Sequence, residues 1–157
     1  MHFATWKAVM GLNIFPLEFH AQMLVRLVVA ALLGSLIGFE RERAGKPAGI
    51  RTHGMVCLGA ALFTVVSLFG FGPSSDITRV AAQIVTGIGF LGAGAILHDR
   101  VSVHGLTTAA TLWVTAAVGL AVGVGMFSMS LVTTILVFAL LRFGPKPVHK
   151  ESQGVSE

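Results

Sequence analysis

The chain has 157 residues, of which 54% are hydrophobic and only 11% are charged, and its formal net charge is +4 at pH 7. Soluble domains carry about 25% charged residues, so this chain has too little charge to cover a water-facing surface. The charges are clustered between long uncharged segments, and a membrane-spanning helix needs about 20 apolar residues. The sequence therefore predicts an all-α integral membrane protein.

The uncharged segments predict five transmembrane helices. In chain order, they cover about residues 17–42, 52–71, 76–98, 106–124 and 128–142. Pro16 favours the first helix start, Gly70 to Pro73 form a stop signal, and Ser74 or Ser75 is the expected N-cap of the third helix. We expect residues 16–143 to form one membrane domain, residues 1–15 an interfacial segment, and residues 144–157 a disordered cytoplasmic tail.

Positive charges predict the orientation of these helices. Most of them follow the first, third and fifth helices, and the positive-inside rule makes those segments cytoplasmic. The N-terminus is then outside and the C-terminus cytoplasmic, in a multi-pass protein whose immediate surroundings are the lipid bilayer. The same basic residues are topology signals near anionic headgroups, so we expect no nucleic-acid partner.

The third expected helix contains a G-x-G-x-x-G pattern, which is typical of dinucleotide-binding turns. Such a turn needs a following helix and an acidic residue about 20 positions on, but here the apolar segment ends soon after the glycines. Small residues let membrane helices approach closely, and we assign that packing role to Gly34, Gly38, Gly87, Gly89, Gly92 and Gly94. A broken third helix whose carbonyl groups face an ion is the alternative.

Ionisable residues in or beside the spans are costly to bury and usually have a partner. At the outer end, Arg26 either pairs with Asp76, close to Arg79, or both groups are separately solvated. Gln83, a neutral polar residue of the third helix, is expected to form a buried hydrogen bond between helices.

At the inner end, Glu40, Arg51 and Asp99 are expected to converge beside Arg41 in a polar cluster. Magnesium prefers carboxylate ligands and retained waters, but the arginines compete for the same carboxylates. The cluster is therefore either a structural network of ion pairs or a metal site with Glu40 and Asp99 as ligands.

Other polar residues carry weaker predictions. His53, His98 and His104 match no metal-ligand spacing and are interpreted as solvated loop residues on the cytoplasmic side. Thr107, Thr108 and Thr111 are expected to hydrogen-bond either within the fourth helix or across to another helix. No Ser-His-Asp or Cys-His arrangement indicates catalysis, so we expect neither an enzyme nor a cofactor.

Four motifs occur in order: GSLIGFER at 34–41, AGIRTH at 48–53, AQIVTGIGFLGAG at 82–94 and GLTTAATLW at 105–113. With these motifs the chain resembles the membrane domain of the MgtC/SapB family, over about residues 26–124. Larger MgtC-type members carry a soluble C-terminal domain, so we expect this chain to be the short, SapB-like form.

The resemblance implies a bacterial inner-membrane protein linked to magnesium homeostasis, to adaptation to low magnesium and, in pathogens, to virulence through intracellular survival. It also implies a regulator that binds other membrane proteins, including ATP synthase. A small oligomeric magnesium or proton transporter is the alternative function. A homo-oligomer is one candidate assembly of this chain.

Overall fold

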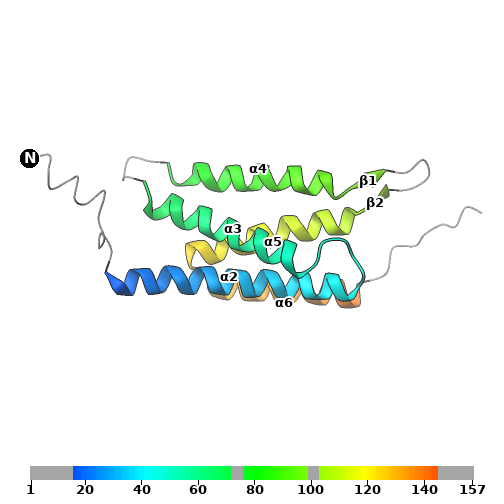
Figure 1. Ribbon diagram of the computed structural model, residues 1–157, viewed down its shortest axis with the longest axis horizontal. Helices are drawn as coiled ribbons and strands as arrows, with labels where there is room; N and C mark the ends of the chain where they lie inside the picture. The colour runs from blue at the N-terminus through cyan, green and yellow to red at the C-terminus, as the bar shows by residue number, and fades with distance from the viewer. Residues whose placement is uncertain (1–15, 72–75, 99–102, 145–157) are drawn as a thin grey trace, which may run out of the picture.

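The computed structural model describes residues 16–71, 76–98 and 103–144 (Figure 1). Within these residues it contains five helices and one two-stranded hairpin: α2 (Leu17–Arg43), α3 (Ile50–Phe69), α4 (Thr78–Gly94), β1 (Leu97–His98), β2 (Val103–His104), α5 (Leu106–Val124) and α6 (Phe127–Phe143). The helical fold expected from the sequence is thus observed in the described residues. The expected interfacial segment at residues 1–15 and the tail beyond residue 144 lie outside the described residues.

Successive helices run antiparallel, so the α2–α3 loop, the β1–β2 hairpin and the end of α6 lie together at one end of the bundle (Figure 1). The α3 helix packs against both α2 and α5, whereas α4 packs mainly against α5 and α6 against α2 and α5. The α4 and α6 helices therefore lie on the outside of the bundle, and the α2–α3–α5 interface is its centre.

Three helices are long and apolar enough to cross a membrane: α2, α3 and α5. The α6 helix is apolar but has 17 residues, and α4 also has 17. At 1.5 Å per residue, 17 residues cover about 26 Å, slightly less than a hydrocarbon core of about 30 Å. The chain is thus a membrane protein with three clear candidate spans, and the count of five remains a prediction.

The α4 helix differs most from its expected bounds. It ends at Gly94 and not at His98, because residues 97–98 pair with residues 103–104 as antiparallel strands. Gly105 then opens α5 at φ +87°, and a Cβ there would overlap the carbonyl group of Ala95, so only glycine fits this turn.

The other end of α4 is also set by a local contact. The helix begins at Thr78, where a carboxylate oxygen of Asp76 accepts hydrogen bonds from the Thr78 amide at 2.9 Å and its hydroxyl group at 2.6 Å. Asp76 thus satisfies an amide at the helix start. The serines expected as N-caps lie at positions 74 and 75, outside the described residues.

Glycines bring the three central helices into close contact. A Cβ on Gly34 of α2 would lie 2.5 Å from the Cβ of Cys57 in α3, and one on Gly38 would lie 2.6 Å from the carbonyl oxygen of Gly49. Gly119 and Gly123 of α5 make equally close contacts with α3, so a side chain at any of these positions would push two helices apart. The small residues of α2 and α5 are therefore used inside the bundle.

The α4 glycines are different: within the described chain the packing prediction is wrong for Gly87, Gly89 and Gly94, whereas Gly92 is buried and packs against α5. A Cβ added at Gly87, Gly89 or Gly94 would meet no atom within 4 Å, and one at Gly92 would meet Ala109 only at ordinary contact distance, 3.7 Å. The sequence shows that these residues are small, but it does not show which of them face another helix.

Candidate functional site

Five buried polar residues meet where α2 ends and where α3 and α5 begin. We call them the buried polar cluster: Glu40, Arg41, His53, Thr108 and Thr111. Their side chains are at most 8% exposed, and His53 is completely buried. The three helix ends meet here because the antiparallel arrangement places them at the same end of the bundle (Figure 1).

Hydrogen bonds in the buried polar cluster connect three helices. The Nη2 of Arg41 donates to the Thr108 hydroxyl group across the α2–α5 interface at 3.3 Å. His53 of α3 lies with Nδ1 at 3.0 Å from the Gly49 carbonyl oxygen and Nε2 at 3.2 Å from the Thr111 hydroxyl oxygen of α5. These contacts fix the relative positions of the helix ends.

The protons in this arrangement can be assigned from its acceptors. A carbonyl oxygen only accepts, so His53 Nδ1 must carry a proton toward Gly49. The Thr111 hydroxyl group lies near His53 Nε2 and also 2.8 Å from the Thr108 carbonyl oxygen, yet it has one proton to donate. When His53 is neutral, its unprotonated Nε2 accepts a hydrogen bond from the Thr111 hydroxyl group. When His53 is doubly protonated, its Nε2–H donates to the Thr111 oxygen, and the hydroxyl proton of Thr111 donates to the Thr108 carbonyl oxygen. The cluster thus allows two hydrogen-bond patterns that differ by one proton.

Two atoms of the cluster have no hydrogen-bond partner among the described residues: Glu40 Oε2 and Arg41 Nε. Leaving a buried polar atom unpaired costs about 1–3 kcal/mol, and more for a charged group. The Glu40 carboxylate and the Arg41 guanidinium group interact electrostatically, but these two atoms make no hydrogen bond to each other. A buried carboxylate with a free oxygen is the one feature of the cluster suited to a further ligand.

The expected convergence of Glu40, Arg51 and Asp99 is not found. Arg51 is exposed on the first turn of α3, Glu40 is buried, and no ion pair joins them. Asp99 lies outside the described residues. Among the residues that the structure describes, no group of three or more His, Cys, Asp or Glu side chains is placed to hold a metal ion, so the metal assignment for Glu40 and Asp99 remains untested.

The outer arginine has a different partner from the one expected. The Nη1 of Arg26 donates to the Gly123 carbonyl oxygen at 2.7 Å, and its guanidinium group lies 5.7 Å from the ring centroid of Phe69. A cation at the C-terminal end of α5 satisfies an orphan carbonyl group and complements the helix dipole. Asp76 is instead bonded to Thr78, whose hydrogen bonds lower the pKa of its carboxyl group. The Arg26–Asp76 pair is therefore wrong.

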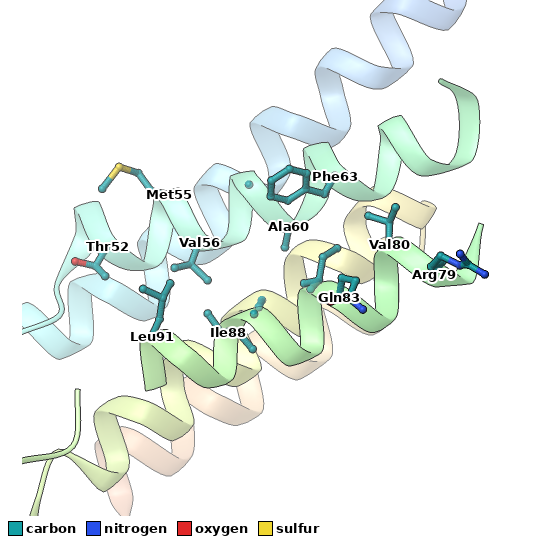
Figure 2. Close-up of a pocket in the computed structure, with 14 residues that line it drawn as sticks. Thr52, Met55, Val56, Ala60, Phe63, Arg79, Val80, Gln83, Ile88 and Leu91 are labelled. Atoms are coloured by element: carbon teal, nitrogen blue, oxygen red, sulfur yellow. The ribbon is translucent and has the colours of Figure 1, made fainter. Parts of the chain in front are cut away.

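Three further expectations are corrected by burial. His53 is not a solvated loop residue but lies fully buried in α3, whereas Thr107 and Gln83 are exposed. Gln83 lies with Arg79 in an apolar groove between α3 and α4, where Figure 2 shows both residues at one end. Within the described residues Gln83 makes no hydrogen bond between helices, because α4 and α3 do not close over it.

Sequence reasoning missed the role of one residue that shapes this region and the burial of two others. Glu42 Oε2 accepts the Ile50 amide at 3.0 Å and stabilises the start of α3, since a carboxylate is favoured at a helix N-terminus. The burial of His53 and Thr111 was missed because it depends on the facing helix. The available signal was the spacing of Thr108, Thr111 and Thr115, which places three hydroxyl groups on one face of α5.

Comparisons with known proteins identify relatives. The profile of the MgtC family matches residues 27–150. The chain is 43% identical to the putative magnesium transporter YhiD of Escherichia coli K12, covering 77% of this chain and 60% of that protein. It is 54% identical to Protein MgtC of Brucella abortus strain 2308, covering 73% of this chain and 48% of the relative. It is 43% identical to Protein MgtC of Salmonella paratyphi A, covering 83% and 59%.

The chain thus spans about half to three fifths of the length of these relatives. No solved structure is significantly similar to it. The region matched by the family profile includes the buried polar cluster, the second part of α2 and all of α3, α4, α5 and α6.

Proposed function

Because this chain belongs to the MgtC family, we propose that it is a magnesium-related protein of the bacterial inner membrane that regulates other membrane proteins by binding them. The observation that carries this proposal is the uncovered small-residue face of α4. We call it the α4 outer face: Ala82, Thr86, Gly89 and Ala93. All four residues are exposed, and nothing in the described chain lies within 4 Å of a Cβ at Gly89.

The α4 outer face has the properties of a helix-packing surface. Its spacing of four, three and four residues places all four side chains on one side of the helix. Such small residues allow a neighbouring transmembrane helix to approach closely, and van der Waals contact then holds the pair together. The Thr86 hydroxyl group donates to the Ala82 carbonyl oxygen at 3.0 Å, so the face presents no unpaired donor to an apolar partner.

The contrast with the other helices strengthens this proposal. The small residues of α2 and α5 are used in contacts with α3, as at Gly34 and Gly119. The equivalent face of α4 has no partner among the described residues, so a helix of a second protein supplies the natural complement. Candidate partners are other inner-membrane transport proteins, including ATP synthase, and a further copy of this chain.

The proposed topology has five spans, with the N-terminus outside and the C-terminus cytoplasmic. The arrangement of the helices supports this topology, because the α2–α3 loop and the end of α6 lie at the same end of the bundle (Figure 1). Arg43, Lys46, Arg51 and Arg142 all belong to these segments and are exposed, and basic loop residues favour the cytoplasmic side.

Photo-crosslinking in living cells tests the binding proposal. A photoreactive residue at position 93, in cells grown at limiting magnesium, should form a discrete adduct heavier than the chain. Gly89→Leu on the same face should abolish the adduct and the growth benefit of the protein at low magnesium. The matched control is Gly87→Leu, which is two residues away but on the groove side of α4. This variant should retain the adduct and the growth benefit. A folded Gly89→Leu protein with the same adduct and the same growth would overturn the proposal.

A small magnesium transporter is the second candidate, and one observation favours it. Glu40 is 8% exposed and its Oε2 has no partner within the described part of the chain. A relative is named a putative magnesium transporter, and magnesium is bound through carboxylates with retained waters. Under this reading Glu40→Gln abolishes magnesium flux while the protein stays folded.

A further inference from the structure

An apolar groove of about 840 Å³ lies between α3 and α4, where the two helices do not close on each other (Figure 2). Its walls are aliphatic along most of its length, with residues such as Val56 and Ala60 from α3 and Ile84 and Ile88 from α4. Polar side chains lie toward its ends, with Thr52 near one end and Arg79 and Gln83 at the other (Figure 2).

The dimensions of the groove indicate what fits it. From Arg79 to Leu91, twelve helical steps of 1.5 Å give a length of about 18 Å. The groove is open to the outside of the bundle and almost entirely apolar, so extended hydrocarbon chains can lie along its aliphatic walls.

The length also matches one leaflet of a bilayer. The hydrocarbon core is about 30 Å thick, so one leaflet is about 15 Å deep. Acyl chains that start at the Arg79 end would therefore run along the groove to about the level of Leu91. Burying them against aliphatic walls fills a space that α3 and α4 leave open.

The polar end of the groove is suited to a phosphate group. Arg79 lies in the first turn of α4 and is exposed, and a guanidinium group binds phosphate oxygens through paired N–H donors. Gln83 lies four residues later on the same side of the helix, and within the described chain its carboxamide group has no hydrogen-bond partner. The neighbouring Asp76 carboxylate already accepts two hydrogen bonds from Thr78.

We propose that this groove binds an anionic phospholipid, with its acyl chains between α3 and α4 and its phosphate held by Arg79 and Gln83. The site goes beyond the proposed regulatory function, because the middle of the groove, at Gly87 and Leu91, faces away from Gly89 and Ala93 of the α4 outer face. The two surfaces can therefore be altered separately.

Native mass spectrometry of the purified, delipidated protein tests the lipid site. The protein is titrated with phosphatidylglycerol and, in parallel, with phosphatidylcholine. It should bind phosphatidylglycerol about fivefold more tightly, the equivalent of about 1 kcal/mol for one arginine near a lipid headgroup. Arg79→Gln should remove that preference and keep binding of both lipids. Arg142→Gln, an exposed arginine outside the groove, should leave the preference unchanged.

Filling the groove tests the acyl-chain position. Gly87→Leu on α4 and Gly59→Leu on α3 each place a bulky side chain in the groove, where a Cβ meets no atom within 4 Å, so both variants should fold. Each should lower the binding of both lipids severalfold, whereas Gly89→Leu on the α4 outer face should not. Far-UV circular dichroism checks that each variant is folded.

Three results would overturn the lipid site. The first is equal binding of the two lipids by the unaltered protein. The second is an equal loss of preference in Arg79→Gln and Arg142→Gln. The third is a lipid-free dimer that Gly87→Leu dissociates, which would make a second copy of the chain the occupant. None of these results bears on partner binding at Gly89, so the lipid site and the proposed function fail separately.

Discussion

Gly34→Ala is expected to force α2 and α3 apart. The added Cβ would lie 2.5 Å from the Cβ of Cys57 and 2.6 Å from the carbonyl oxygen of His53. Carbon atoms in contact prefer about 3.5–4.0 Å, so the helices must separate by about 1 Å. Overpacking of this kind costs about 1–3 kcal/mol. The displaced atoms include the Cys57 side chain in the fully buried core, which has no free space to absorb the shift.

The matched control is Gly59→Ala in α3, where an added Cβ meets no atom within 4 Å. Alanine is favoured over glycine inside a helix by about 0.5–1 kcal/mol, so this variant should be as stable as the unaltered protein or slightly more stable. The free energy of unfolding of the two variants should therefore differ by about 1–3 kcal/mol, with Gly34→Ala the less stable.

Unfolding in mixed micelles measures this difference. The purified variants are titrated with sodium dodecyl sulfate in dodecylmaltoside, and helix content is followed by far-UV circular dichroism. A lower midpoint for Gly34→Ala at an unchanged slope reports lost stability. If the two variants unfolded within about 0.5 kcal/mol of each other, close packing at Gly34 would not hold α2 and α3 together, and the account of the central interface would be wrong.

Three further predictions follow from the same contacts. Reporter fusions in the α2–α3 loop, in the β1–β2 hairpin and after α6 should give a cytoplasmic signal. Fusions between α3 and α4 or between α5 and α6 should give an exterior signal. An exterior signal from the hairpin would contradict the five-span topology. Arg26→Gln and Asp76→Asn should have additive effects on unfolding, because the two residues have separate partners, and a coupling energy above about 0.5 kcal/mol would contradict this. Thr111→Val should cost about 1–3 kcal/mol by leaving His53 Nε2 unpaired. In the same micelle titration Thr115→Val should cost less, because its equally buried hydroxyl group donates only to its own helix, and equal losses would refute the His53 contact.

The sequence predicts the helices well where turn residues mark their ends. The α5 helix matches its expected bounds because glycines with positive φ flank it at positions 105 and 125. Its C-terminal turn is closed by Gly125, as glycine commonly does after a helix. The end of α4 was misplaced because the apolar residues 95–97 continue the hydrophobic pattern, and a short apolar segment does not distinguish helix from strand.

The candidate site was less predictable because it depends on which helix faces face inward. The sequence places Glu40 and Arg41 at a helix end, but their burial follows from the approach of α3 and α5. His53 lies at the expected cytoplasmic side and matches no metal-ligand spacing, which favours a solvated residue, whereas in α3 its ring lies against Thr111. Arg26 was matched to the nearest expected acid, but a backbone carbonyl group at a helix end is its actual acceptor.

Magnesium flux into reconstituted vesicles tests the central claim most directly, because it separates a regulator from a transporter. The protein is reconstituted into phosphatidylglycerol-containing vesicles that hold a magnesium-sensitive dye, and the rate of uptake is compared with that of protein-free vesicles. A regulator that acts by binding other membrane proteins should give no uptake above the protein-free rate. Uptake well above that rate, lost in a folded Glu40→Gln variant, would contradict the proposed function and identify Glu40 as part of an ion path.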